Sequence, residues 1–140
     1  MNRTLGFDLG SKTLGVSVSD PLGMIARALT TLRFDSDDYD SALAQAQALI
    51  REQHADKVVL GLPRHMNGDI GVRGEISIAF KEKLESSGVE VVLWDERLTT
   101  VAANRILLQG DLSRKKRKKV IDQMAAVQIL QSYLDYSNRG

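Results

Sequence analysis

The sequence predicts an α/β fold in which a mixed five-stranded sheet has helices on both faces. Alternating apolar and polar residues fill most of the first 34 positions, and short apolar runs then alternate with segments of helical periodicity. The first pattern predicts three antiparallel strands, and the second predicts parallel strands joined by helical crossovers. With 140 residues, 43% of them hydrophobic, we expect a single domain over residues 1–140.

The first three strands are predicted by alternation. Residues 4–9 and 14–19 each alternate apolar residues with small or polar ones, and the four residues GSKT between them suit a hairpin connection. Residues 25–34 follow the turn signal DPLG and predict a third strand. Short connections between three successive strands predict an antiparallel meander.

Strands and helices alternate in the rest of the chain. The apolar runs at residues 57–62 and 89–94 are typical of parallel strands that are covered on both faces. Gly88 and Gly110 are suited to ending helices, and Thr99 can cap the start of one. Apolar residues at helical spacing predict four helices, over residues 39–53, 72–87, 99–109 and 119–136.

Composition excludes several classes of protein. The absence of cysteine excludes a disulfide scaffold, a zinc-thiolate site and a cysteine nucleophile. The sequence contains no Walker loop, HExxH helix or GxSxG elbow. No apolar stretch is long enough for a signal peptide or a membrane span, so we expect a cytoplasmic protein with no membrane partner.

One segment concentrates positive charge. Six of the 19 basic residues are consecutive, which leaves 13 basic against 18 acidic residues, a balance of −5, in the rest of the chain. Closely spaced cations attract the phosphates of nucleic acid, although a run of this kind can also be a solvated charged loop. This basic run consists of Arg114, Lys115, Lys116, Arg117, Lys118 and Lys119.

Acidic residues lie near the carboxyl ends of the first and last predicted strands. Asp8 stands between two glycines on the polar face of the first strand, and Asp95 and Glu96 follow the last. In open α/β sheets, ligands bind at the carboxyl ends of the parallel strands. Asp8 could instead satisfy turn amides at a strand end.

Asp122 on the predicted last helix is another carboxylate that has either a structural or a metal-binding role. Its neighbours at helical spacing are apolar, so its carboxylate needs either a lysine of the basic run or a cation as partner. Three carboxylates at one sheet edge would form an oxygen-ligand site for Mg²⁺ or Mn²⁺. Two such ions can cleave a phosphodiester bond, and the basic run close to Asp122 favours nucleic acid as the substrate.

Four segments in order resemble the YqgF, or RuvX, family. They are GFDLGSKTLGVSVSD, LGLPRHMNG, DERLTT and VIDQMAAVQILQSYLD, and together they span essentially the whole chain. That family belongs to the RNase H-like superfamily and is similar to Holliday junction resolvases of the RuvC type. Ser17 departs from the family's pattern, in which alanine is common at this position.

The resemblance implies a metal-dependent nuclease that processes the 5′ end of pre-16S rRNA, with resolution of four-way DNA junctions as the alternative. Asp8 and Asp122 match the catalytic acids of the first strand and the last helix. The DERLTT segment supplies the third acid, for which we expect Glu96, with Asp95 as an additional or alternative metal ligand. We expect two Mg²⁺ or Mn²⁺ ions, bound with substrate. The expected contacts to nucleic acid are Lys12, Arg64, Asn67, Arg97 and the basic run.

Two other classes compete with this interpretation. The FDLGSKTLGV segment also resembles the phosphate-binding hairpin of actin-like ATPases and sugar kinases, but those enzymes enclose a nucleotide between two domains. A non-catalytic RNA- or ribosome-binding module would need the basic run but not the three acids. The sequence does not distinguish RNA from four-way DNA, and it allows a monomer or a weak homodimer, alone or on ribosomal particles.

Overall fold

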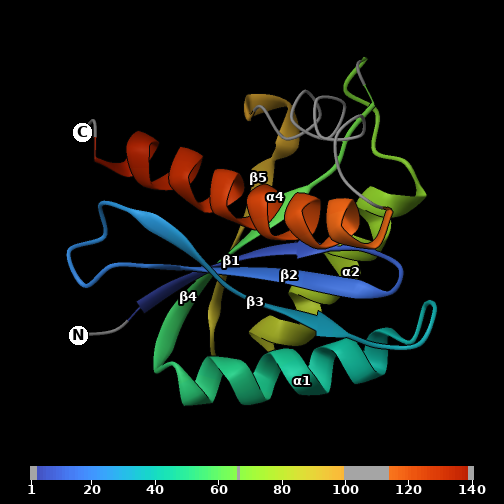
Figure 1. Ribbon diagram of the computed structural model, residues 1–140, viewed down its shortest axis with the longest axis horizontal. Helices are drawn as coiled ribbons and strands as arrows, with labels where there is room; N and C mark the ends of the chain where they lie inside the picture. The colour runs from blue at the N-terminus through green and yellow to red at the C-terminus, as the bar shows by residue number, and fades with distance from the viewer. Residues whose placement is uncertain (1–2, 66, 100–113, 139–140) are drawn as a thin grey trace.

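A computed structural model describes residues 3–65, 67–99 and 114–138, and within the last range it describes side chains from residue 124 onward (Figure 1). The first three strands are β1 (Arg3–Leu9), β2 (Thr13–Ser19) and β3 (Ala26–Arg33). They form the predicted antiparallel meander, in which Phe7 pairs with Val16 and Val16 pairs with Thr30.

Two parallel strands complete the sheet on the other side of β1. β4 (Ala55–Leu62) pairs with β1, and β5 (Glu90–Asp95) pairs with β4, so that the order across the sheet is β3-β2-β1-β4-β5. The carboxyl ends of β1, β4 and β5 therefore lie at one edge, as the sequence predicts. The predicted mixed five-stranded sheet is confirmed.

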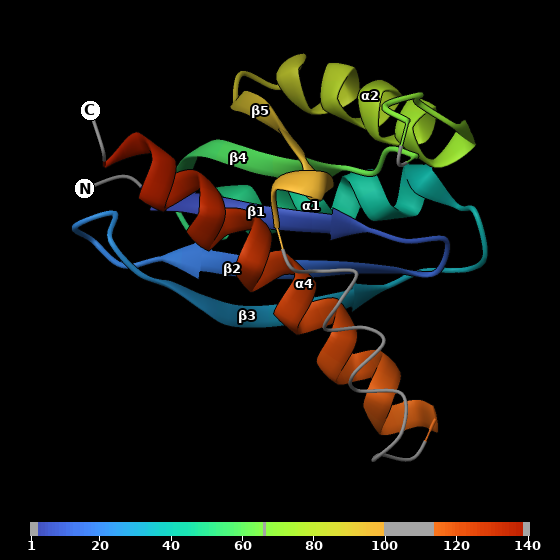
Figure 2. The same ribbon diagram turned by 90° about the horizontal axis from the view of Figure 1, so that it is seen from above.

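Helices cover both faces of the sheet. α1 (Tyr39–Glu52) and α2 (Val72–Glu85) lie on one face, and α4 (Arg114–Ser137) crosses the other diagonally (Figure 2). A short 3-10 helix, η1 (Glu96–Leu98), follows β5 directly. None of the helices in the described residues is long and apolar enough to span a membrane.

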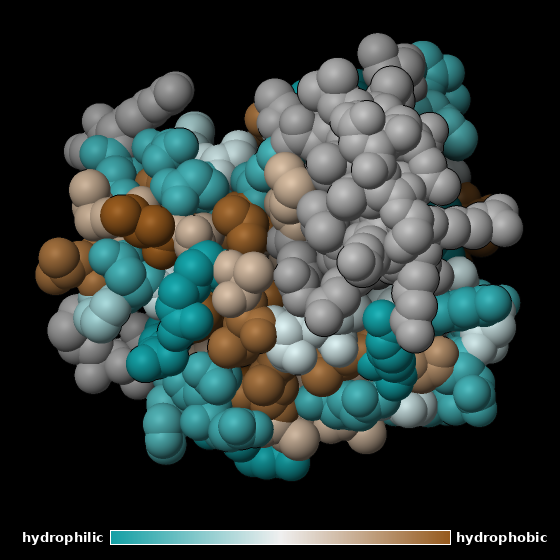
Figure 3. Space-filling model, in the orientation of Figure 1, coloured by the Kyte–Doolittle hydropathy of each residue, from teal (hydrophilic) through white to brown (hydrophobic). Residues whose placement is uncertain are grey.

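The alternation within the strands produces two hydrophobic cores. Leu5 and Phe7 of β1 belong to the core under α1 and α2, whereas Val59 of β4 packs with Ile129 and Leu130 under α4. Hydrophilic and hydrophobic residues mix on the face in Figure 3, and Leu22, Met24 and Ile25 of the β2–β3 turn are among the exposed large hydrophobic residues.

Helix α4 lies very close to the sheet because β1 has a glycine beneath it. A Cβ atom on Gly6 would lie 2.7 Å from Leu130 Cβ and 2.9 Å from the Ala126 carbonyl oxygen. The Ser17 hydroxyl on β2 donates a 2.7 Å hydrogen bond to the same carbonyl. The Gln131 side chain accepts from Ala26 N at the start of β3. These contacts fix both the height and the direction of the helix.

The element boundaries differ from the predictions mainly in the last helix. α4 begins at Arg114 rather than at residue 119, so the basic run forms its first turns instead of a loop. α2 ends at Glu85, three residues before the left-handed Gly88. The predicted helix over 99–109 lies outside the described residues, apart from Thr99.

Candidate functional site

Asp8 lies on the face of the sheet that α4 covers, with glycine as its neighbour on both adjacent strands. It shares this face with Gly6, two residues earlier on the same strand. Asp8 pairs with Gly15 on β2, and because Phe7 pairs with Leu60, the next residue on β4 is Gly61. Neither of these cross-strand neighbours therefore contributes a side chain beside the partly buried Asp8.

Glu96 comes to the same face from η1. Its Cγ atom lies 3.4 Å from the position that a Cβ on Gly61 would occupy, and its Oε1 atom is shielded from solvent. Its side chain thus lies over the glycine that adjoins Asp8. Two acids that are 88 positions apart in sequence are thus brought to one face of the sheet beside Gly61, over which Ile129 of α4 also packs.

Asp95 points instead toward two arginines. Its carboxylate accepts from the Arg97 guanidinium at 2.7 Å and from the Arg97 backbone N–H at 2.9 Å, and Arg64 Nε lies 3.6 Å away. The hydrogen bond from the Arg97 side chain, with smaller contributions from its backbone N–H and from the charge of Arg64, lowers the pKa of Asp95. The same pairing raises the pKa of Arg97. Asp95 therefore holds a cluster of positive charge beside Glu96.

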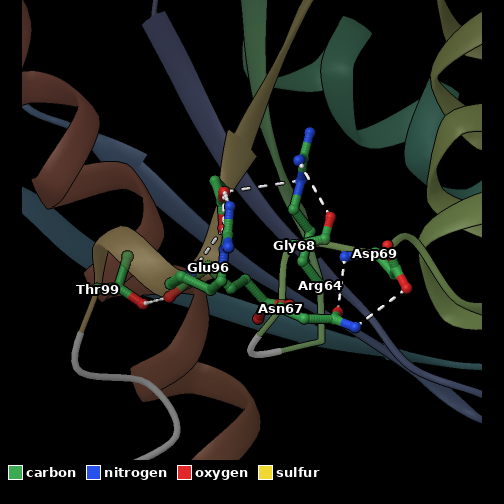
Figure 4. Close-up of polar contacts among 8 residues, drawn as sticks. Arg64, Asn67, Gly68, Asp69, Glu96 and Thr99 are labelled. Carbon is green, nitrogen blue, oxygen red and sulfur yellow. Dashed lines mark hydrogen bonds and ion pairs between the residues drawn. The ribbon is translucent and has the colours of Figure 1, made fainter.

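The loop after β4 completes this cluster (Figure 4). The Asn67 side chain accepts from Asp69 N and donates to the Asp69 carboxylate, so it closes the turn. Arg64 donates to the Gly68 carbonyl at 3.4 Å, and the Arg97 guanidinium lies against Gly68. The structure thus brings Arg64 and Arg97 together, whereas it places the predicted nucleic-acid contact Asn67 within its own turn.

The turn of α4 that contains Asp122 lies toward the carboxyl end of β1. Gln131 contacts the start of β3, which is the sheet edge where β1 begins, so α4 runs opposite to β1. Asp122 precedes Ala126 by four residues, about 6 Å of helix, and Asp8 follows Gly6 by two residues, about 7 Å of strand. The backbone turn at residue 122 therefore reaches the level of Asp8.

The structure gives less detail for the remaining predicted site residues. Lys12 is exposed in the β1–β2 turn, at the same sheet edge. The side chains of Asp122 and of the basic run lie outside the described part. Among the side chains that the structure describes, no three carboxylates or histidines gather closely enough to hold a metal ion.

Comparison with known proteins identifies the family. The RuvX family, described as Holliday junction resolvase, matches residues 2–136. The chain belongs to the RuvX family. The family predicted from the four sequence segments is thus confirmed.

Curated RuvX relatives match the chain along nearly its whole length. A protein from Geobacillus kaustophilus is 55% identical over 95% of this chain and 97% of its own, and one from Bacillus subtilis is 53% identical over 97% and 99%. Both are named as candidate pre-16S rRNA nucleases. Among solved structures, Thermus thermophilus RuvC in complex with a Holliday junction substrate has a TM-score of 0.66 at 15% identity, covering 100% of this chain and 97% of its own. This likeness confirms the RNase H-like fold.

Two residues beside the site were not predicted from the RuvX sequence. Arg73 of α2 donates to the Leu9 carbonyl at 3.1 Å and to the Tyr39 hydroxyl, and so holds the end of β1 one residue beyond Asp8. Ser17 fixes α4 through the Ala126 carbonyl. A lone arginine on a helix gives no sequence signal, but the departure of Ser17 from the family's pattern did single it out.

Proposed function

We propose that this RuvX protein is a nuclease that hydrolyses phosphodiester bonds of RNA, and that it processes the 5′ end of pre-16S rRNA. The single observation that carries the proposal is the placement of Asp8 and Glu96 on one face of the sheet, beside Gly61. Relatives that are more than half identical and of matching length carry the corresponding name. A carboxylate pair at the carboxyl ends of parallel strands suits catalysis better than packing.

We propose that Asp8, Glu96 and Asp122 hold two divalent cations, Mg²⁺ or Mn²⁺. The donor set fits, since hard cations take carboxylate oxygens and Asp8 has a glycine as its cross-strand partner on β2. Such ions, when bound with substrate, activate a water and stabilise the leaving oxygen. The turn of α4 at the level of Asp8 supports Asp122 as the third ligand.

The chain's own side chains position the substrate. Arg64 and Arg97 present guanidinium groups at the rim of the site, where they can bind a phosphate of the RNA backbone. Asp95 orients Arg97 through paired hydrogen bonds. The basic run on the first turns of α4 would attract the backbone, and Lys12 adds a charge from the β1–β2 turn.

Cleavage of two substrates side by side tests the proposal. RNA with the 5′ extension of pre-16S rRNA and a synthetic four-way DNA junction are incubated with Mn²⁺, with Mg²⁺ and with EDTA. We expect the wild type to cut the RNA with metal only, and Asp8→Asn and Glu96→Gln to reduce cutting to background. Asp40→Asn makes the same chemical change on the exposed surface of α1 and should leave cutting unchanged.

Four-way junction resolution is the second candidate, because the family's description names that activity. If the protein cuts only the junction, with metal, and Asp8→Asn does not, then the substrate is four-way DNA and not RNA. A binding module makes a different prediction: removing an acid near phosphate would preserve or strengthen RNA binding, and the wild type would cut neither substrate. That result with intact RNA binding would refute the nuclease proposal.

A further inference from the structure

An open pocket lies next to η1, between the end of β5 and the C-terminal turns of α4. Its volume is about 520 Å³, within the range of about 300–1,000 Å³ that is typical of small-molecule sites. It is lined by Trp94, Leu98, Ser132, Asp135 and Tyr136. None of these residues has a part in the proposed hydrolysis.

The aromatic residues of the pocket are held in place. The Trp94 ring packs edge-on against Tyr133 at 5.6 Å between ring centroids, and its Nε1 donates to the Ser132 hydroxyl at 3.0 Å. Tyr136 also packs against Trp94, at 5.5 Å between ring centroids, yet it is 65% exposed. Leu98 of η1 is 64% exposed. Two large side chains from separate elements thus leave apolar surface in solvent beside a fixed indole.

The charged group of the pocket is a hydrogen-bond acceptor. Asp135 is exposed, and its Oδ1 accepts from Gln131 Nε2 at 3.0 Å, which orients the carboxylate. An ionised carboxylate accepts hydrogen bonds only, so it favours a planar ligand whose edge carries donors. Guanine presents two adjacent donors on its Watson–Crick edge, its ring N–H and its amino group, which match the two oxygens of a carboxylate.

We propose that this pocket binds an unpaired nucleobase of the RNA substrate, with a preference for guanine. The base stacks on Tyr136 and Leu98, and its donor edge faces Asp135. Stacking of bases on aromatic side chains is the common mode of single-strand recognition. The inference rests on the proposed function, since it treats the carboxylate edge as the place where the RNA is cut.

The position of the pocket assigns the base to a nucleotide near the cut. Leu98 lies two residues beyond Glu96 in η1, about 4 Å along the axis of a 3-10 helix. Stacked nucleotides of one strand are spaced by about 3.4 Å. The base therefore belongs to one of the first nucleotides beside the hydrolysed phosphate, and it fixes which phosphate reaches Asp8 and Glu96.

The fluorescence of Trp94 tests the pocket directly, because the chain contains one tryptophan. The full-length protein in EDTA is titrated with GMP, AMP, CMP and UMP, with excitation at the red edge of the tryptophan band. We expect saturable quenching that is tightest for GMP. Tyr136→Ala should weaken GMP binding by about 5- to 150-fold, and Tyr136→Phe should restore it. Asp135→Asn should reduce the preference for GMP over UMP.

Matched controls separate this inference from the nuclease proposal. Leu98→Ala should also weaken binding, whereas Leu22→Ala, which truncates another highly exposed leucine in the β2–β3 turn, should not. The titration needs neither metal nor cleavage. If the protein binds GMP but cuts no substrate, the pocket proposal is supported and only the nuclease proposal is refuted. A lack of saturable response to all four nucleotides, or wild-type affinity in Tyr136→Ala, overturns the inference even if RNA is cut.

Discussion

Gly6→Ala tests how the site depends on the position of α4. The added Cβ would lie 2.7 Å from Leu130 Cβ and 2.9 Å from the Ala126 carbonyl oxygen, and it would also contact the Ser17 hydroxyl. Carbon atoms normally pack at about 3.5–4.0 Å, so the helix has to move away from the sheet by about 1 Å. Both obstructing α4 atoms belong to the backbone or are attached to it, so a change of rotamer cannot relieve the contact.

The expected cost follows from two effects. Overpacking of a core costs about 1–3 kcal/mol, and loss of the buried hydrogen bond from Ser17 to Ala126 costs about 0.5–1.5 kcal/mol. We therefore expect Gly6→Ala to lower the free energy of unfolding by about 2–4 kcal/mol. Local propensity predicts the opposite sign, since alanine is favoured over glycine inside a strand by about 0.5–1 kcal/mol.

Urea unfolding and RNA cleavage measure the two consequences. The control is Gly10→Ala, two residues past Asp8, where the added Cβ lies 3.3 Å and 3.5 Å from atoms of Thr13 and needs only a small adjustment. A displacement of about 1 Å in the turn that carries Asp122 should also lower cleavage about 100-fold in the folded variant. Equal unfolding midpoints for Gly6→Ala, Gly10→Ala and the wild type would refute the reasoning.

Two further predictions concern charge. Asp95→Asn releases Arg97 and should reduce cleavage about 10-fold, less than Glu96→Gln does. The pKa of Asp95 is lowered in the folded protein, so its ionised carboxylate stabilises the fold at pH values above the ordinary pKa of 3.8. This stabilisation is lost as the pH falls through the lower pKa of the folded protein. The urea midpoints of the variant and the wild type should therefore converge only in acid. Replacing the four lysines of residues 114–119 by glutamine should weaken the dependence of RNA affinity on salt. The slope of log affinity against log salt concentration should fall by about 0.7 for each phosphate that the variant no longer neutralises. An unchanged slope would place the basic run away from the substrate.

The first two strands could be predicted because their large apolar residues recur at every second position, which places them on one face of the sheet. Alternation in residues 4–9 and 14–19 reports this burial directly, and β1 and β2 match those ranges within about one residue. The start of α4 could not be predicted in the same way. Six consecutive cations have no apolar periodicity, so the pattern becomes visible only where the helix begins to pack on the sheet, after the basic run.

The candidate site was predictable in its residue types but not in its geometry. Asp95 and Glu96 are adjacent, and sequence alone cannot say which of two neighbours turns inward. In the structure, the side chain of Asp95 bonds to Arg97, and Glu96 lies over Gly61. The two side-chain directions depend on where η1 begins and on Gly61, which is 35 positions before Glu96. A local sequence pattern contains neither piece of information.

The central strand of the sheet is built from the first residues of the chain, and it is covered by the last helix. The hydrogen bond from Ser17 to Ala126 joins positions 109 residues apart. During synthesis, Asp8 therefore leaves the ribosome early but has no α4 above it until the final helix emerges. A chain that stops before α4 lacks Asp122, the proposed third acid, and the basic run together. The proposed nuclease site is therefore complete only after α4 has been synthesised.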